Sequence, residues 1–560
     1  MRLSRLSLIA VAALAGTACT TVATAPLAPA AAPFQFDPAA LSQHVQVLGS
    51  DAFEGRAPNS PAEQKTVAYI VDQFAKAGLH PGGAVVDGRR TWTQPVPLLQ
   101  SNWAATPHLA VHIGGQQIDL TQGNEIAARA PTNGDKQIAM TDVPMVFVGY
   151  GVKAPERGWD DFKGMDLKGK VLVMLVNDPD FEGGEGDFGG KAMTYYGRWT
   201  YKYEEGARQG AAGVLVIHET EPASYGWATV KNSNTNTMFD IVRADPKAEH
   251  PPVEGWIQRD LAAKLFEASG TTFDAMKAAA KRKDFRPVAL KAGFTAHGNA
   301  DAQVITSQNV VGLLPGTTHP DETVLYTAHW DHLGIGQPDA NGDAIYNGAL
   351  DNATGISQLI EQARAFASEP RTQRSVVFLA VTAEEKGLLG SEYYAANPLY
   401  PLGKTVGVLN TDSMGVFGQA KDFSISGTAK LGLLDDLVEE GAKLGRTFTP
   451  DRHPETGGFY RSDHFTMAKV GVPAISFKSG GDLVNGGLAR GEAIAKDYTA
   501  KRYHQPDDEW SPDWDFSGMV DDARLLHALG MRLANGREWP NWSADSEFRA
   551  ARDKSAGDRR

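Results

Sequence analysis

Two histidines and four carboxylates in this chain are placed where they could hold metal ions together. They are His329, Asp351, Glu384, Glu385, Asp412 and His504. All but His504 lie at the end of an apolar run, just after one, or at the start of the helix predicted to follow one. Imidazole nitrogens and carboxylate oxygens without thiolates are a ligand set suited to a catalytic zinc site rather than a structural one.

The set holds more ligands than one tetrahedral ion needs, which points to two metals that share a carboxylate and a water. Two neighbouring metals can bind a bridging hydroxide and polarise a carbonyl, while a carboxylate that is not a ligand moves the proton. Glu384 and Glu385 are adjacent beyond a strand, so their side chains point in different directions, and one can coordinate while the other acts as the base. Asp331 is two residues past His329 and is a candidate acceptor for the other ring nitrogen of that histidine.

Each of these residues also has an ordinary structural explanation. Asp351 and Asp412 could cap helices, the Glu384–Glu385 pair could be a solvated helix start, and His504 could be an exposed loop residue. A histidine at a strand end is more often packed or exposed than bound to a metal. The joint pattern favours the metal site, because one such residue follows each successive strand.

The elements that must position these residues form an alternating strand and helix pattern. Apolar runs at 324–326, 374–381, 405–410 and 470–477 are typical of buried parallel strands, and 355–367 has the apolar face of a helix. In such folds the carboxyl ends of the strands meet at one edge, where ligands bind. We therefore predict an α/β fold with a doubly wound, mixed but mostly parallel sheet flanked by helices.

Composition excludes some functional classes. At 560 residues the chain is too long for one hydrophobic core, so two or more domains are expected. Hydrophobic content of 42% and charged content of 22% are those of an ordinary globular protein. The net charge of −13 disfavours a nucleic-acid partner, because phosphate binding requires concentrated Lys and Arg.

The N-terminus has the pattern of an export signal. A basic start is followed by a short apolar run, 6–15, and by small residues before Cys19, the only cysteine in the chain. Cys19 resembles the lipid-modified cysteine of bacterial lipoproteins, although Gly16 stands where that signal usually has Leu. The alternative is an ordinary cysteine in a discarded signal peptide. We expect export to a periplasmic, lipid-anchored or secreted location, with membrane attachment possible only through Cys19.

The predicted domain order follows from shifts in pattern along the chain. It is an export signal at 1–25, an Ala/Pro-rich linker at 26–36, a first part of the main domain at 37–130, an inserted small β-rich module at 131–286, a second part with the metal site at 287–542, and a flexible charged tail at 543–560. Within the module, one helix is predicted, at 201–210.

The metal-type residues lie in motifs that resemble a known family. The motifs are HWDH at 329–332, GALDNATG at 348–355, EE at 384–385 with GLLGS at 387–391, NTD at 410–412, RSDH at 461–464 and YHQPD at 503–507. Together they are similar to the co-catalytic dizinc aminopeptidases of clan MH, which include bacterial leucyl aminopeptidases and glutamate carboxypeptidases. The likeness runs from about Leu41 to Gly530.

The resemblance implies a role for each residue of the set. One zinc would be held by His329, Asp351 and Asp412, and the other by Glu385, His504 and the same Asp351, with Glu384 as the general base. The cofactor would be two Zn²⁺ per chain and the substrate a peptide.

The resemblance also suggests two further contacts. Tyr503 matches a tyrosine that hydrogen-bonds the developing oxyanion, although it could be a packed aromatic. Arg461 is a candidate substrate contact, or a surface arginine paired with Asp463.

The inserted module resembles a protease-associated domain through residues 147–151, 158–162 and 166–171. In the family this domain is thought to cover the cleft or to help select the substrate. Its own residues suggest no chemistry.

The function we expect is that of a secreted zinc exopeptidase that removes N-terminal residues through a hydroxide bound by two zincs and a Glu base. A dipeptidase or glutamate-type carboxypeptidase is an alternative, but it would gather arginines for an acidic side chain, and none beyond Arg461 stands near the motifs. A glutaminyl cyclase shares the fold but usually lacks the module. A metal-free binding protein of the same fold is disfavoured because every expected ligand is present.

Overall fold

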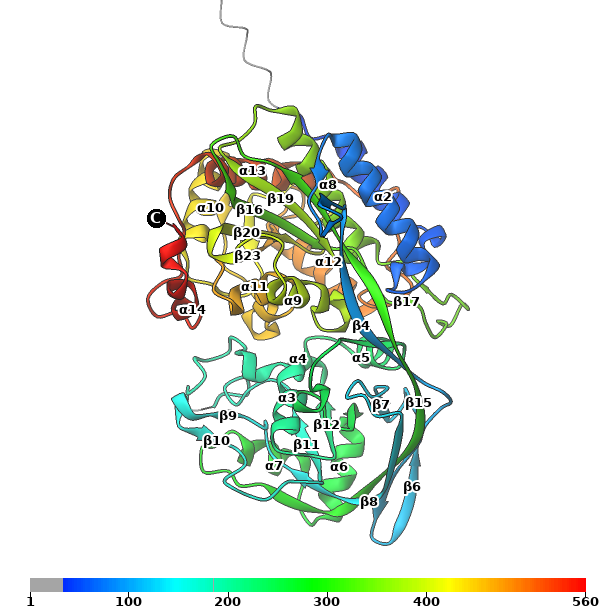
Figure 1. The fold of residues 1–560 in the computed structure, drawn as a ribbon. Helices are drawn as coiled ribbons and strands as arrows, with labels where there is room; N and C mark the ends of the chain where they lie inside the picture. Colours follow the sequence, from blue (N-terminus) through cyan, green and yellow to red (C-terminus); the bar gives the residue numbers. More distant parts are fainter. Residues whose placement is uncertain (1–33, 185, 560) are drawn as a thin grey trace, which may run out of the picture.

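The computed structural model describes residues 34–184 and 186–559, which form two lobes (Figure 1). The insert lobe, residues 108–297, lies below in Figure 1, and the main lobe contains the described residues on either side of it in the sequence. The long strands β4 (Thr93–Trp103) and β15 (Val288–Leu314) pair antiparallel and run from one lobe towards the other. The predicted export signal and Cys19 lie outside the described residues.

The main lobe is built on a mixed sheet whose centre is parallel. Four strands, β19 (Arg374–Val381), β16 (His319–His329), β20 (Thr405–Thr411) and β23 (Ala474–Ser479), lie side by side in this order and run in the same direction. Antiparallel β15 borders β19, and antiparallel β21 (Asp422–Ile425) borders β23. This is the mostly parallel sheet that the apolar runs predicted.

Both faces of this sheet are covered, which explains why its strands are apolar throughout. In β19, Val376 and Phe378 pack in the core on one face, while Val377 and Leu379 pack in the core on the other. Such alternation follows from the two-residue period of a strand. The apolar cores on both faces hold the parallel strands in register.

Helices shield the two cores. On one side lie α1 (Pro38–Leu48), α2 (Pro61–Ala77), α8 (Thr354–Ser368) and α13 (Ser517–Asn535), and on the other α9 (Leu389–Ala396) and α11 (His464–Lys469). Helix α2 begins after Ser60, whose side chain accepts from the Glu63 amide, and ends at Gly78 in the left-handed region. Helices α10 (Gly432–Lys443) and α12 (Gly487–Lys501) complete the lobe.

The insert lobe has its own core and its own parallel strands. Strands β8 (Gln137–Phe147), β11 (Val171–Leu175), β12 (Gly213–His218) and β14 (Val253–Gln258) pair in parallel in this order. The predicted helix at 201–210 is α3 (Trp199–Arg208), and four more helices, α4 to α7, lie between Thr220 and Ala280. The lobe is therefore richer in helix than its glycine-rich turns suggested. The predicted boundaries at 131 and 286 stay predictions.

Both ends of the described chain are more ordered than expected. Phe36, at the end of the predicted linker, is 5% exposed and packs in the main core. The predicted flexible tail instead contains α14 (Arg549–Lys554), with Phe548 and Arg552 buried against the main lobe. The prediction failed because two buried anchors are hidden in a charged, apolar-poor segment. Among the described residues, no helix has the length and apolarity needed to cross a membrane.

Candidate metal centre

The predicted set of metal-type residues converges at one edge of the main sheet. His329 is the last residue of β16, Asp412 follows β20, and Glu384 opens the short turn η6 (Glu384–Lys386) after β19. These three strands are parallel neighbours, so their carboxyl ends meet. Asp351 precedes α8, and His504 lies between α12 and α13.

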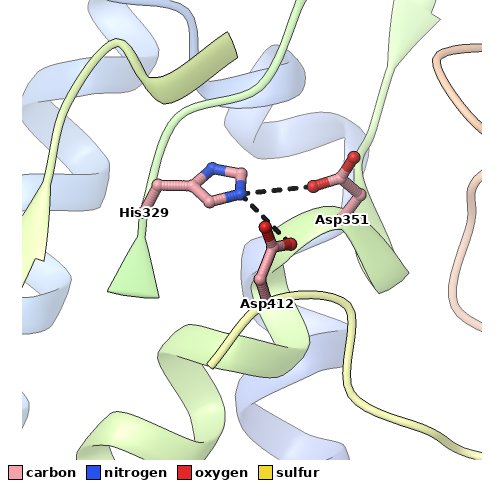
Figure 2. Close-up of side chains that lie close together, drawn as sticks. All are labelled: His329, Asp351 and Asp412. Atoms are coloured by element: carbon pink, nitrogen blue, oxygen red, sulfur yellow. Dashed lines mark ion pairs between the residues drawn. The ribbon is translucent and has the colours of Figure 1, made fainter. Parts of the chain in front are cut away.

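The first cluster consists of His329, Asp351 and Asp412 (Figure 2). The Nε2 atom of His329 lies 3.3 Å from Oδ1 of Asp351 and 3.5 Å from Oδ1 of Asp412. His329 is buried, and its Nε2 has no hydrogen-bond partner. A buried nitrogen that faces two carboxylates without bonding either is an arrangement that suits a cation between them.

The second cluster shares Asp351 with the first. The Nε2 atom of His504 lies 3.4 Å from Oδ2 of Asp351 and 3.0 Å from Oε2 of Glu385. The two oxygens of Asp351 therefore face different histidines, Oδ1 towards His329 and Oδ2 towards His504. Despite its burial, the pKa of the Asp351 carboxyl is held well below its usual range by these two histidines.

The residues present fit zinc. Two imidazoles and three carboxylates form two groups of three ligands joined through Asp351, with no sulfur donor among them. Carboxylates and histidines without an ion would have to titrate against one another in a buried space, which is costly. The donor set thus supports a metal at this edge.

Asp351 is held in place by a residue that the sequence did not single out. The Asp508 carboxylate accepts hydrogen bonds from the backbone amides of Leu350 and Asp351, both at 3.0 Å, and from the Tyr498 hydroxyl at 3.2 Å. The peptide bond between Asp351 and Asn352 is cis. Asp508 follows the YHQPD motif directly, so the loop that carries His504 also fixes Asp351.

Arg56 braces the loop between His329 and Asp351. Its buried guanidinium donates to the backbone oxygens of Trp330 (2.8 Å), Asn347 (2.7 Å) and Gly348 (2.7 Å), and to Leu48 (2.6 Å). Burial lowers the pKa of Arg56 to about 10, against the attraction of Asp508 and Asp331. The N-terminal helices are thereby tied to the metal-type residues.

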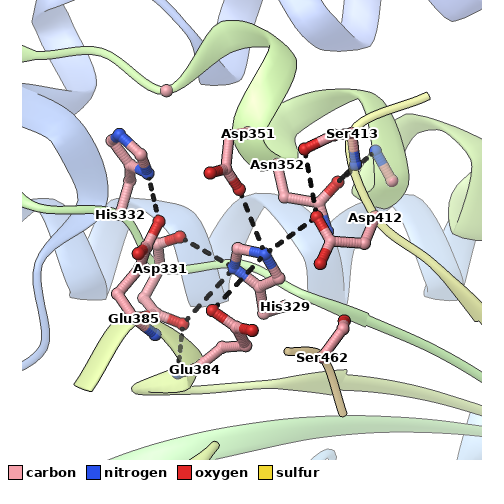
Figure 3. A network of polar contacts seen from close by, with 12 residues as sticks. His329, Asp331, His332, Asp351, Asn352, Glu384, Glu385, Asp412, Ser413 and Ser462 are labelled. Atoms are coloured by element: carbon pink, nitrogen blue, oxygen red, sulfur yellow. Dashed lines mark hydrogen bonds and ion pairs between the residues drawn. The ribbon is translucent and has the colours of Figure 1, made fainter. Parts of the chain in front are cut away.

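Asp331 acts differently from the prediction. Nδ1 of His329 lies 3.2 Å from the backbone oxygen of Asp331 but 3.8 Å from its carboxylate. The carboxylate instead accepts from the backbone amides of Glu384 (3.0 Å) and Glu385 (3.4 Å) (Figure 3). Asp331 therefore fixes the glutamate turn with its side chain and contacts the histidine with its main chain.

The two adjacent glutamates, Glu384 and Glu385, have different contacts. Glu385 is fixed between two histidines, with Oε1 2.6 Å from Nδ1 of His332 and Oε2 3.0 Å from Nε2 of His504. The Glu384 carboxylate lies farther from a histidine, with Oε2 3.9 Å from Nε2 of His329. Burial raises the pKa of Glu384 well above its usual range, whereas the histidines outweigh burial and hold the pKa of Glu385 below its own.

The insert lobe supplies a contact to the site. The hydroxyl of Ser233 lies 2.7 Å from Nδ1 of His504, and Asn232 donates to the His504 carbonyl at 2.9 Å. Both belong to α5 (Trp227–Asn234). If Nε2 held a metal, Nδ1 would carry the proton and could donate it to Ser233, which would fix the ring. No sequence pattern could reveal this contact, since the partners are far apart in the chain.

Tyr503 and Arg461 lie together beside this cluster. The Tyr503 ring lies against the His504 ring, with centroids 3.9 Å apart, and its hydroxyl accepts from Arg461 at 2.9 Å. Arg461 also donates to the Ser224 hydroxyl of the insert lobe at 2.9 Å. The alternative pairing of Arg461 with Asp463 at the surface is wrong, because Arg461 faces the insert lobe.

A pocket of about 180 Å³ opens onto these residues from between the lobes. The main lobe contributes Glu384, Glu385 and His504 to its wall. The insert lobe contributes Arg198 and Tyr225, among others. A substrate in the pocket would therefore contact both lobes at once.

Comparisons with known proteins agree with this geometry. Residues 309–526 match the model of peptidase family M28. A probable zinc metalloprotease of Pyricularia oryzae is 36% identical over 107 residues, which cover 19% of this chain and 21% of that protein. Aminopeptidase YwaD of Bacillus subtilis is 40% identical over 91 residues, 16% of this chain and 17% of its own. The chain thus spans about a fifth of the length of the curated relatives it matches.

The similarity in fold extends over more of this chain than the similarity in sequence. The solved aminopeptidase from Aneurinibacillus sp. strain AM-1 superposes with a TM-score of 0.53 at 19% identity, over 90% of this chain and 96% of that one. All the metal-type residues of the two clusters lie within the matched segment 309–526. Through that segment, this chain is similar to peptidase family M28.

Proposed function

We propose that this protein is a zinc-dependent metallo-exopeptidase that removes N-terminal residues from peptides. The observation that carries the proposal is Asp351, whose two oxygens face His329 and His504 at 3.3 and 3.4 Å. A carboxylate shared by two buried ligand groups suits a pair of metal ions rather than one. The match to peptidase family M28 supports the reaction class.

The residues that would hold the metals follow from the two clusters. His329, Asp412 and Asp351 would hold one zinc, and Glu385, His504 and Asp351 the other. When bound, zinc at such a site polarises the peptide carbonyl and lowers the pKa of water. The surrounding protein orients the ligands through Ser233 and Asp508.

Glu384 is the group that we assign to proton transfer. It lines the pocket, is buried, and lies 3.9 Å from His329 through Oε2 without a ligand-like contact to a second histidine. Its carboxylate would take the proton of the attacking water and deliver it to the nitrogen of the leaving amine. Tyr503 is the proposed donor to the developing oxyanion, although in this structure its hydroxyl accepts from Arg461.

The position of the insert lobe supports action at chain ends. The insert lobe forms part of the pocket wall beside the metal centre, so a long chain running through in both directions would meet it. The free amino group would lie near the carboxylates of the centre. We also infer that the chain is exported, from its N-terminal pattern, and that the insert lobe is a protease-associated domain.

The test uses the full chain loaded with zinc and two matched peptides, one with a free and one with an acetylated amino terminus. We expect release of the N-terminal residue from the free peptide, loss of this activity with a chelator, and no cleavage of the acetylated peptide. Cleavage of both peptides at internal bonds would contradict exopeptidase action. Activity that persists after complete metal removal would contradict the metal mechanism.

A further inference from the structure

His332 is a buried histidine to which the proposed function gives no role. It is the last residue of the HWDH motif, three residues after the end of β16, and is only 1% exposed. Within the described residues, neither of its ring nitrogens makes a hydrogen bond. A buried imidazole normally has at least one partner, because an unpaired polar group is costly to remove from water.

The ring of His332 is directed at a carboxylate of the metal centre. Its Nδ1 atom lies 2.6 Å from Oε1 of Glu385 (Figure 3). This distance is short enough for a hydrogen bond, yet neither atom has a hydrogen-bond partner, so the two are not aligned for one. Two donor atoms that converge in a buried space without bonding suit a shared cation, as the Nε2 atom of His329 does with its two carboxylates.

Asp351 completes a group of three donors around this histidine. One donor atom from each of His332, Asp351 and Glu385 lies within 4.8 Å of the other two. The same two carboxylates face His504, whose Nε2 lies 3.4 Å from Asp351 and 3.0 Å from Glu385. The rings of His332 and His504 are close, with centroids 5.6 Å apart and planes at 80°. The two histidines therefore approach the same pair of carboxylates.

The backbone beside His332 leaves room for its ring. A Cβ atom added at Gly348 would lie 2.4 Å from Cγ of His332, well inside van der Waals contact. Gly348 also has a φ of 59°, in the left-handed region that glycine adopts without strain. Its carbonyl accepts a hydrogen bond from Arg56, which holds the loop at this position. Packing against the main chain, rather than a hydrogen bond, thus places the ring.

We propose that His332 is a further metal ligand, at the zinc position that it shares with His504. The two carboxylates of this position are Asp351 and Glu385. The proposal rests on the zinc-binding part of the proposed function and gives this position two imidazoles and two carboxylates. Four protein donors still admit one water or substrate ligand, because catalytic zinc can become five-coordinate. The other zinc position has a single imidazole, that of His329.

The additional ligand makes the two zinc positions different. Imidazole suits zinc and other transition metals, whereas carboxylate also suits harder cations such as Mn²⁺ and Mg²⁺. The position with two imidazoles is therefore the tighter one for zinc. His504 is supported by Ser233 of the insert lobe, whereas His332 lies in the main lobe next to β16. His332 thus keeps zinc at this position independently of how the lobes dock.

The experiment detects the ligand directly, with His332→Cys in the full chain and cobalt(II) in place of zinc. Nδ1 is the ring nitrogen nearer the main chain, so a cysteine sulfur reaches nearly the same point, and its bond to the metal is about 0.2 Å longer. Cys19, the only cysteine of the chain, is changed to serine in every sample, so that the introduced residue is the only thiolate. We expect a sulfur-to-cobalt charge-transfer band in the near ultraviolet.

His464→Cys is the matched control. His464 is also buried with both ring nitrogens unpartnered, but among the described residues it belongs to no group of possible metal ligands. This variant should bind cobalt without the charge-transfer band. No band in His332→Cys, or a band of equal strength in both variants, would overturn the proposal.

Zinc affinity provides a second measurement, in a variant without an added thiol. Titration of metal-stripped His332→Asn against a chromogenic chelator should show the tighter site weakened by about 100-fold, as for the loss of one of four ligands, with a smaller effect on the other site. Affinities equal to those of wild type would contradict the proposal. If His332→Asn does not fold, the cobalt band of His332→Cys decides the outcome.

These readouts separate the proposal from the proposed function, because they need the metal alone and no peptide. If zinc-loaded wild type hydrolyses peptides but His332→Cys shows no band, the additional ligand is wrong and the proposed function stands. If the band appears but wild type hydrolyses no peptide, the ligand stands and the proposed function fails.

Discussion

At the scale of single residues, the site is marked by the different contacts of Glu384 and Glu385, to which we assign different roles. Glu385 is clamped between His332 and His504, whereas Glu384 makes no such contact and faces the pocket. We predict that Glu384→Gln keeps zinc but lowers kcat by about 10²- to 10⁴-fold, because only proton transfer is lost. Metal analysis and steady-state kinetics on the same preparation provide the measurement.

Glu385→Gln is the matched control for this prediction. It should lose zinc affinity together with activity, since one oxygen of its carboxylate faces His504 at 3.0 Å. Near-normal kcat in Glu384→Gln, with zinc retained, would show that another group moves the proton.

Ser233 provides a second prediction for a single residue. Ser233→Ala removes the hydroxyl that lies 2.7 Å from Nδ1 of His504, so zinc affinity should fall by about 10- to 100-fold, as for other partners of ligand histidines. Competition with a chromogenic chelator measures it, and Ser233→Thr should restore binding.

Thr235→Ala is the control, because that hydroxyl donates to the Lys231 carbonyl rather than to the site. An unchanged zinc affinity in Ser233→Ala would mean that α5 does not position His504.

The site residues that could be predicted are those whose position follows from the apolar pattern of the neighbouring sequence. His329, Asp412 and Glu384 could be found because each follows an apolar strand, and the strand ends converge. Ser233 and Arg198 could not, because their positions depend on how the insert lobe docks. The carboxylate of Asp331 was assigned to the wrong partner, because a strand-end residue can reach either a histidine or a backbone amide.

At the scale of elements, His250 links two strands of the insert lobe. It lies between β13 (Met238–Ile241) and β14, with Nε2 3.2 Å from Asp240 and Nδ1 2.7 Å from Glu254. Burial alone would lower its pKa, but these two carboxylates raise it to about 10. The folded state therefore holds a proton that the unfolded chain, with a pKa near 6.5, releases first.

This link predicts a defined pH dependence of stability. The contribution of His250 to the free energy of unfolding is complete below pH 6.5 and is lost as the pH rises to about 10. The slope is at most about 1.4 kcal/mol per pH unit. Denaturant unfolding of wild type and His250→Gln across this range measures it. A stability difference between the two that does not shrink with rising pH would contradict the account.

The C-terminal segment yields another prediction for an element. The Phe548 ring packs on Trp542 and Phe459, with centroids 4.9 and 5.7 Å away, and Arg552 donates to the Thr405 carbonyl at the start of β20. Phe548→Ala should lower the free energy of unfolding by about 3 kcal/mol, because it empties a packed site.

Lys554→Ala, at an exposed position of the same helix, should change the unfolding free energy by less than about 0.5 kcal/mol. Urea unfolding followed by tryptophan fluorescence compares them. Equal stability of the two variants would mean that the segment is the flexible tail that its composition suggests.

The strands of the main sheet were easier to predict from the sequence than helix α12 and the C-terminal segment. The continuous apolar runs identified β16, β19 and β20 because strands buried on both faces leave no room for polar residues. Helix α12 was missed because none of its residues is buried, so it has no apolar face to recognise. The C-terminal segment was predicted to be flexible because it is charged and poor in apolar residues. Two buried side chains, Phe548 and Arg552, are enough to hold it against the main lobe.

At the scale of the whole molecule, the two lobes form one site. Arg461 of the main lobe donates to Ser224 of the insert lobe, and Lys386, beside Glu385, donates to Asn236 at 2.6 Å. The metal-type residues belong to the main lobe, while part of the pocket wall and the contact to Nδ1 of His504 belong to the insert lobe. The sequence predicted an inserted module, but a pocket lined by both lobes could be found only from the structure.

The central claim is that Asp351 joins two zinc sites that serve peptide hydrolysis. The measurement is a zinc titration of the metal-stripped full chain, with bound zinc and leucyl-p-nitroanilide hydrolysis followed together, for wild type and Asp351→Asn. We predict two zinc ions per wild-type chain, activity that rises with occupancy, and loss of both tight sites and of activity in the variant. One zinc per chain, or hydrolysis without zinc, would contradict the account.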